Sequence, residues 1–286
     1  MKALYSGVSG MRSHQTKMDV IGNNIANVNT NGYKSQRVTF RDVYYQQIKS
    51  PGAGVEGERG GTNSSQVGYG AQVGSIDTMH SGTGYSPTNS FSDLYINGDG
   101  YFMVQNASGE QFLTRYGAFH FDPTGNLVDS NGSLVLGLNK SDAGTVDPDG
   151  VITGLTPITI ENFDDYKNIS INSDGTITGY NIKAAAGTEP IETIGRIGIA
   201  YVPNQSALIL EGNSYYSESN NTGDIITYSP GLGQTGELVA FGLEMSNVDL
   251  ANEFSDMIIT QRGFQANTKI ITVVDQMLEE LVNLKR

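Results

Sequence analysis

Apolar residues recur at a strict interval of seven near both ends of the chain. The C-terminal set is Leu250, Met257, Phe264, Ile271 and Leu278, and the N-terminal set is Leu4, Met11, Met18 and Ile25. A seven-residue apolar repeat keeps one face of a helix turned toward another helix. The pattern predicts that residues 1–32 and 246–286 form a terminal helical domain, in which two long helices pair in the manner of a coiled coil.

Start and stop signals support these two helices. Ser246 followed three residues later by Asp249 approximates a capping box, and no proline interrupts the sequence after it. The turn-forming residues 27–32 predict that the first helix ends near Asn27. The C-terminal helix would be roughly 57 Å long, which is more than a domain of this size usually needs to cover its own core.

The positions between the repeated apolar residues are mixed. Val8, Gln15 and Gly22 lie between the N-terminal ones, and Gln261, Thr268 and Asp275 lie between the C-terminal ones. A helix pair with polar residues at alternate layers is weak alone, so further helices are expected to complete it. The open alternative is that both ends fold back onto one globular domain. The residues expected to mediate self-assembly are Leu4, Val8, Met11, Met18, Ile25, Leu250, Phe254, Met257, Phe264, Ile271 and Leu278.

Residues 33–74 read as a connector and an extended arm. Residues 33–48 mix aromatic and basic residues with short apolar runs, and we expect them to be partly ordered. Residues 49–74 are mostly Gly, Ser, Asn and Pro with little to bury, which predicts a long loop or an extended arm. Such a segment is either a flexible linker or a contact between subunits.

Residues 75–245 read as a β-rich body. Short apolar runs alternate with turn sequences at residues 97–100, 122–125, 131–132 and 172–175, the first of which predicts a hairpin between 94–96 and 101–104. Further strands are expected at 194–202, 207–210 and 237–243. The expected fold class is therefore α+β, with a mostly antiparallel sandwich or barrel-like body. Residues 140–192 are its most polar part and could form a small insertion.

Composition and charge narrow the possible functions. The chain has 286 residues, 36 glycines and no cysteine, which excludes disulfides, thiol catalysis and cysteine-based metal sites. The net charge is −13, and most of the negative charge lies between the two predicted helices. An acidic body argues against nucleic acid as a partner.

No segment approaches the ~18 apolar residues of a membrane helix. The N-terminus does not read as a cleaved signal peptide, because polar or charged residues interrupt it every few positions. Membrane insertion is therefore not expected, and any route of export would leave the N-terminal helix attached.

Motifs that could carry chemistry are better explained as turns. Asn97-Gly98-Asp99-Gly100, Asp147-Pro148-Asp149-Gly150 and Asn172-Ser173-Asp174-Gly175 resemble calcium loops but lack the frame of an EF-hand. Gly231-Leu232-Gly233-Gln234-Thr235-Gly236 matches the dinucleotide fingerprint, yet a strand rather than a helix is expected after it. His14, His80 and His120 lie in separate elements. No catalytic residue, metal or cofactor is expected, and the chain is not expected to be an enzyme.

Several runs of sequence closely resemble the bacterial flagellar rod and hook proteins. At the N-terminus these are residues 4–11, 19–30 and 32–34, and at the C-terminus residues 243–250, 261–267 and 280–286. Between them, residues 93–102 and 114–119 are similar to strands of the same family's middle domain. Within the family, the opening run, the Gly60-Gly61-Thr62-Asn63 arm and the ending look most like short hook subunits of Gram-positive bacteria. The alternative is the distal rod protein of the basal body, whose insertion is similar to residues 50–53.

The resemblance implies a structural role in swimming motility. Many identical subunits would polymerise through their terminal helices into a flexible tube, a universal joint that transmits torque from rod to filament. The implied partners are copies of the same chain, the distal rod, the hook cap, the hook-filament junction proteins and the flagellar type III export apparatus. The implied location is extracellular, in the flagellar hook and basal body.

A second class of function remains open at this point. The middle could be an adhesin-like or enzymatic β-domain whose terminal helices form only an intramolecular coiled coil. That alternative expects helical ends in the dilute monomer, whereas the assembly hypothesis expects ends that are largely disordered before polymerisation.

Overall fold

A computed structural model describes residues 2–54, 57, 60–140, 150–161, 163–183 and 191–284. The chain divides into two compact units. The terminal unit comprises residues 1–28, 35–79 and 248–286, and the β body comprises residues 29–34 and 80–247. The chain therefore passes from one unit to the other four times along the sequence.

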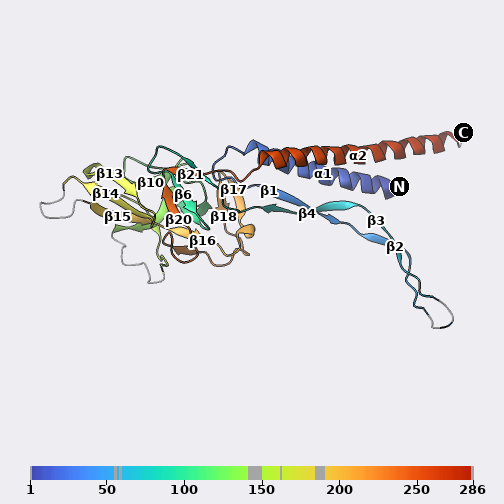
Figure 1. Ribbon diagram of the computed structural model, residues 1–286, viewed down its shortest axis with the longest axis horizontal. Coiled ribbons are helices and arrows are strands. Elements are labelled where there is room, and N and C mark those ends of the chain that lie inside the picture. The colour runs from blue at the N-terminus through green and yellow to red at the C-terminus, as the bar shows by residue number, and fades with distance from the viewer. Residues whose placement is uncertain are drawn as a thin grey trace. The chain divides into compact units, whose positions relative to one another are not determined.

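Two antiparallel helices lie side by side in the terminal unit (Figure 1). They are α1, Lys2–Ala26, and α2, Leu250–Asn283. The first helix ends next to Asn27, as predicted, while α2 begins four residues later than Ser246. Its N-cap is Asp249, whose carboxylate accepts hydrogen bonds from the backbone N–H groups of Ala251 and Asn252. The capping residue is thus the acidic one rather than the serine.

Four strands of the terminal unit form two antiparallel pairs. β1, Gln36–Asp42, pairs with β4, Ala71–Thr78, and β2, Tyr45–Lys49, pairs with β3, Ser65–Gly68. Residues 33–48 thus contain strand β1 and most of β2, and the β2–β3 hairpin forms the arm. Most side chains of β2 and β3 are exposed. These two strands therefore lack the alternation of apolar and polar residues by which a half-buried strand is recognised.

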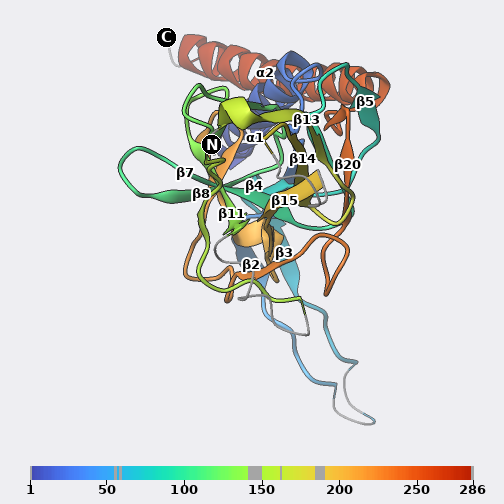
Figure 2. The same ribbon diagram turned by 90° about the vertical axis from the view of Figure 1, so that its left-hand side faces the viewer.

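The β body is antiparallel throughout its described residues and contains a main sheet of thirteen strands. Its central path runs in the order β13-β14-β15-β11-β7-β8-β18-β17. Two short pairs, β6 with β20 and β5 with β21, accompany it. The strands are β5 Tyr85–Pro87, β6 Leu94–Asn97, β7 Tyr101–Gln105, β8 Gln111–Thr114, β9 Phe119–Phe121, β10 Leu127–Asp129, β11 Leu134–Asn139, β12 Thr156–Pro157, β13 Tyr166–Ile171, β14 Thr176–Asn181, β15 Ile191–Ile197, β16 Ile199–Tyr201, β17 Ile209–Gly212, β18 Tyr215–Ser217, β19 Ile226–Tyr228, β20 Glu237–Ala240 and β21 Gly242–Glu244, with 3-10 turns at Phe163–Asp165 and Gln205–Ala207. The α+β class is confirmed. Figure 2 shows the β7–β8 hairpin projecting from the body.

Three of the four predicted turn sequences join strands that pair with each other. The hairpin predicted across the first of them, residues 97–100, is wrong. The turns at residues 122–125, 131–132 and 172–175 join β9 to β10, β10 to β11 and β13 to β14. β6 and β7, however, do not pair, because β6 pairs with β20 and β7 with β8, β11 and β16. Gly98 and Gly100 between them have φ of 135° and 128°, which a residue with a Cβ rarely adopts. The segment carries the chain from one sheet to another.

The polar stretch after residue 140 extends the main sheet. β14 pairs with β15, which pairs with β11, so residues 166–181 continue the β body. The Asp174 carboxylate in the turn before β14 accepts hydrogen bonds from the backbone and hydroxyl of Thr176. The similar turn at Asp147–Asp149 lies outside the described residues.

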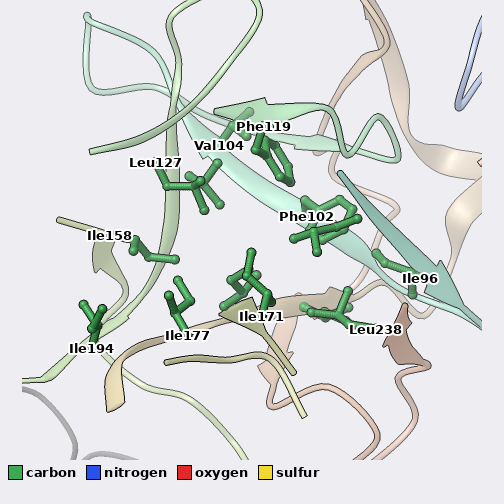
Figure 3. Close-up of a cluster of buried hydrophobic side chains, with 14 of the residues drawn as sticks. Ile96, Phe102, Val104, Phe119, Leu127, Ile158, Ile171, Ile177, Ile194 and Leu238 are labelled. Atoms are coloured by element: carbon green, nitrogen blue, oxygen red, sulfur yellow. The ribbon is translucent and has the colours of Figure 1, made fainter. Parts of the chain in front are cut away.

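Apolar side chains from most of these strands meet in one core (Figure 3). Phe102 on β7 is fully buried and packs edge to face on Phe119, with ring centroids 5.1 Å apart. Each buried side chain of this size stabilises the fold by about 1.5–3 kcal/mol relative to exposure. The β body thus has a closed core of its own.

Candidate assembly surface

The α1–α2 interface is held at one end by polar contacts. The Asn24 side-chain amide donates a hydrogen bond of 3.0 Å to Glu253, and Lys17 forms an ion pair of 2.9 Å with Asp256. Both pairs are partly exposed, so each stabilises by at most about 1 kcal/mol, and their main effect is to fix the register of the two helices.

Glycines bring the two helices close together along the rest of the interface. A Cβ added to Gly10 would lie 2.9 Å from the Asn267 amide, and one added to Gly263 would lie 2.7 Å from the imidazole of His14. The His14 ring also packs edge to face on Phe40 of β1, with centroids 5.7 Å apart. Burial, and secondarily the charge of Lys17, lowers the pKa of His14 and favours the neutral ring.

The α2 residues turned toward α1 follow a heptad pattern, shifted by one position from the predicted one. Met257, Phe264 and Ile271 are half-buried, and the layers between them are formed by Thr260, Asn267 and Val274. Of these, Thr260 is 1% exposed. The expected intermediate positions Gln261, Thr268 and Asp275 are exposed instead. In each heptad, the second residue turned toward α1 therefore lies three residues after the repeated apolar residue, and not four residues after it as predicted.

The predicted N-terminal residues lie beside this interface. Leu4, Val8, Met11, Met18 and Ile25 are all half-buried, whereas the fully buried residues of α1 are Gly7, Ser13, Ile21 and Asn24. The polar members of the buried set hold the strands of the terminal unit. The Ser13 hydroxyl donates to the Ala71 carbonyl of β4, and the Asn24 amide exchanges hydrogen bonds with the backbone of Gln36 in β1.

Much of α2 presents apolar side chains to solvent. Among the predicted assembly residues, Leu250, Phe254 and Leu278 are 38%, 49% and 42% exposed. Sequence reasoning missed the other exposed apolar residues of this helix because they fall outside the seven-residue repeat. They are Ile258, Ile259, Ile270, Val273, Met277, Leu281, Val282 and Leu284. Soluble monomers rarely leave large apolar surfaces uncovered, which makes this helix a candidate surface for contact with another protein.

The β2–β3 arm is a second incomplete surface. Every residue of β2 is exposed, and β2 pairs only with β3 in the described part of the chain. Tyr44, just before β2, is 84% exposed and Ile48 is 64% exposed. A two-stranded hairpin without a covering layer is marginally stable in water, so the arm is expected to gain order from a neighbour.

A buried ionic cluster fastens the ends of the β body. Lys34 and Glu244 form a buried ion pair of 2.6 Å, and Arg115 lies 3.4 Å from the other carboxylate oxygen of Glu244. The Lys34 ammonium also donates to the Ser81 carbonyl, and Arg115 donates to the Gly98 carbonyl. These bonds join residues 29–34, 80–84 and 242–247, which are the β-body segments that continue in sequence into the terminal unit.

A half-buried histidine accompanies this cluster. The His80 Nδ1 atom lies 2.7 Å from the Tyr101 hydroxyl, and Arg115 stacks over the Tyr101 ring at 5.1 Å. Burial, followed by the positive charges of Lys34 and Arg115, lowers the pKa of His80 to about 4. The imidazole is therefore neutral at pH 7, and its Nδ1 atom shares a hydrogen bond with the Tyr101 hydroxyl.

Comparison with known proteins identifies the family of this chain. Residues 4–34 match the family described as flagella basal body rod protein, residues 95–179 the flagellar hook protein FlgE/F/G D1 domain, and residues 242–284 the flagellar basal body rod FlgEFG protein C-terminal domain. The flagellar basal-body rod protein FlgG of Bacillus subtilis (strain 168) is 45% identical over the full length of both chains. The chain belongs to the flagellar rod and hook protein family.

Within the flagellar rod and hook family, rod proteins resemble this chain more closely than hook proteins do. In Borreliella burgdorferi the basal-body rod protein FlgG is 32% identical over 100% of this chain and 99% of its own length. The hook protein FlgE of the same organism is 28% identical over the full length of both chains, and that alignment extends over 442 positions. The hook resemblance favoured by the sequence runs is thus the weaker one, because those runs belong to the termini and β strands that rod and hook proteins share.

The family matches fall on the elements described above. The two terminal matches contain most of α1 and α2, and the middle match begins within β6 and ends within β14. Neither helix has a stretch long and apolar enough to cross a bilayer within the described residues. Lys34, Arg115 and Glu244 of the ionic cluster also lie within the three matched segments.

Proposed function

We propose that this protein is a structural subunit of the distal rod of the bacterial flagellum. The observation that carries the proposal is the end-to-end match of 45% identity to a basal-body rod protein, with almost no difference in length. The longer alignment with a hook protein implies residues for which this chain has no counterpart. The role is that of a building block rather than of an enzyme.

The exposed surfaces support polymerisation. In the proposed rod, the apolar face of α2 packs against helices of neighbouring copies, and the β2–β3 arm bridges to another copy. The predicted assembly residues have two different roles. They are Leu4, Val8, Met11, Met18, Ile25, Leu250, Phe254, Met257, Phe264, Ile271 and Leu278. Those that face α1 hold the helix pair within one chain, and the exposed ones contact other chains.

The pairing of α1 and α2 changes the mechanism that the sequence suggests. The ends need not be disordered before assembly, because the pair is formed within one chain and held by Asn24–Glu253 and Lys17–Asp256. Helices packed along the axis of a tube resist twisting, which suits a shaft that transmits torque. The flexible bending expected of a hook is therefore not part of this proposal.

The proposed location and partners follow from this role. The subunit would be exported by the flagellar type III apparatus with its N-terminal helix intact and would lie outside the cytoplasmic membrane, between earlier rod proteins and the hook. Copies of the same chain would be its main partners. The hook cap and the hook-filament junction proteins would not contact it directly.

Electron microscopy of basal bodies from cells that lack this protein tests the proposal. We expect rods that stop short and carry no hook, and restoration of full rods when the gene is supplied again. Complete rods that lack only the hook would show that the chain is a hook subunit. Normal rods and hooks would contradict both assignments.

A further inference from the structure

The C-terminal end of α2 extends beyond its partner helix. Gly7 of α1 lies against Ile271, so Lys2, five residues earlier in an antiparallel pair, lies opposite about Gln276. Residues 277–283 therefore have no part of α1 beside them, and Figure 1 shows α2 running on past the N-terminus. We call these last turns of α2, with Leu284, the overhang.

The overhang is amphipathic. At 100° per residue, its apolar side chains cover about 160° of the helix surface, and the two exposed acidic residues Glu279 and Glu280 lie one on each side of this arc. The apolar residues are Met277, Leu278, Leu281, Val282 and Leu284, which are between 42% and 82% exposed. A helix end of this kind is the shape and chemistry that binds in an apolar groove.

The terminal unit also contains an open groove of about 650 Å³. One wall is a face of α1, and the other is formed by the start of β4 and by the residues that join β1 to β2 and β3 to β4. The described side chains that line it are mostly apolar or hydroxyl-bearing, and none of them is acidic. They are Tyr5, Val8, Ser9, Arg12, Ser13, Thr16, Val43, Tyr44, Tyr69, Ala71, Gln72 and Val73.

The charges of the groove and the overhang are complementary. Arg12 is exposed within the groove, and Lys2 lies over the ring of Tyr69, 5.7 Å from its centroid. These two cations would meet the carboxylates that flank the apolar arc of the overhang. Opposite charges around an apolar contact fix its register more than its strength.

We propose that the groove binds the α2 overhang of a second copy of this chain. The occupant cannot be the chain's own overhang, because α2 is one unbroken helix that runs away from α1 beyond Lys2. The groove and the overhang are different surfaces, so the contact is head-to-tail, and such a contact generates an open helical filament unless its rotation closes a ring. This inference rests on the proposed function and names the residues that would join successive subunits.

Cross-linking between two cysteine variants tests the contact, since the native chain contains no cysteine. Val8→Cys and Leu281→Cys chains are co-expressed in cells that lack the native protein, and their isolated basal bodies are treated with a short bis-maleimide. We expect a covalent dimer of the two chains. The matched control replaces Leu281→Cys by Ser255→Cys, which is exposed near the other end of α2 and should give no dimer.

Charge reversal provides an independent measurement. Arg12→Glu alone and the pair Glu279→Arg with Glu280→Arg should each lower the number of completed rods per cell, and the combination should restore it. If the chain is present in basal bodies but neither the dimer nor the restoration is seen, the groove contact is wrong while the proposed function stands. Equal dimer yields from the test and control pairs would also overturn the contact. Absence of the chain from basal bodies would overturn the proposed function itself.

Discussion

The two units of this protein bury their apolar residues very differently. In the β body, fully buried side chains such as Leu94, Phe102 and Ile197 form a continuous core. In the described part of the terminal unit, the only buried apolar side chains are Ile21 and Val38. The β body can therefore fold by its own contacts, whereas the terminal unit leaves most of its apolar side chains partly or fully exposed. Mutations in the two units should separate folding from assembly.

Removal of the Glu244 carboxylate should strongly destabilise the β body. Glu244→Gln leaves the buried cations Lys34 and Arg115 without their counter-charge, and breaking a buried pair in this way costs about 3–5 kcal/mol. The free energy of unfolding in urea should fall accordingly. The control Glu192→Gln removes an exposed pair with Lys140 and should cost no more than about 1 kcal/mol. Equal effects would show that the cluster does not stabilise the β body.

Acid should destabilise the β body through His80. Because folding lowers the pKa of His80 from 6.5 to about 4, the unfolded chain binds the proton more tightly. The stability is present above pH 6.5 and is lost as the pH falls toward 4, by at most about 3 kcal/mol.

Urea unfolding at pH 7 and pH 4.5 measures this loss. The loss should be smaller in His80→Gln, which can still form a hydrogen bond with Tyr101, than in the native chain. A His80→Gln variant with the full native pH dependence would assign the loss to other groups.

A methyl group at the helix crossing should weaken the terminal unit alone. Gly263→Ala places a Cβ about 2.7 Å from the His14 ring, so the helices must separate. Overpacking costs about 1–3 kcal/mol and is partly offset by the better helix propensity of alanine, which leaves a loss of about 1–2 kcal/mol. Thermal melting of the helical circular-dichroism signal measures it.

The same substitution elsewhere on the helix pair is the control. Gly22 has no atom within 4 Å of an added Cβ, so Gly22→Ala should stabilise α1 by up to about 1 kcal/mol. Opposite signs at the two glycines would establish that Gly263 allows the close approach. Stabilisation at both would mean that the helices are not in contact there.

The smallest effect on stability is expected at Phe254. Phe254→Ala removes a ring that is 49% exposed, so the free energy of unfolding should change by about 0.5 kcal/mol, while rod assembly in cells should fail. Phe102→Ala in the β-body core should instead cost about 3–5 kcal/mol. Normal rods with Phe254→Ala would remove this residue from the assembly surface.

The sequence predicts the helices well and their contacts less well. Apolar residues at every seventh position locate α1 and α2 because burial against one partner imposes that period. The intermediate layers were misplaced because Thr260 and Asn267 are polar, and a pattern of apolar residues gives no weight to them. Gly10 and Gly263 were missed for a related reason. Glycine disfavours helices, so its value in close packing is visible only once the partner helix is known.

Contacts between distant segments of the β body could not be predicted. Lys34, Arg115 and Glu244 meet from three parts of the sequence and carry no local signal. The hairpin expected across residues 97–100 looked convincing because turn residues separate two apolar runs, yet strand pairing depends on which edge is free in the folded sheet. β20 supplies that edge for β6.

The four passages of the backbone between the units have a mechanical consequence. A force applied to α1 and α2 enters the β body through several peptide segments at once, and those segments are clamped to each other around Glu244. Hydrogen bonds loaded side by side share a force, whereas bonds loaded one after another break singly. A subunit connected in this way would lose its contacts with other chains before its own β body unfolded.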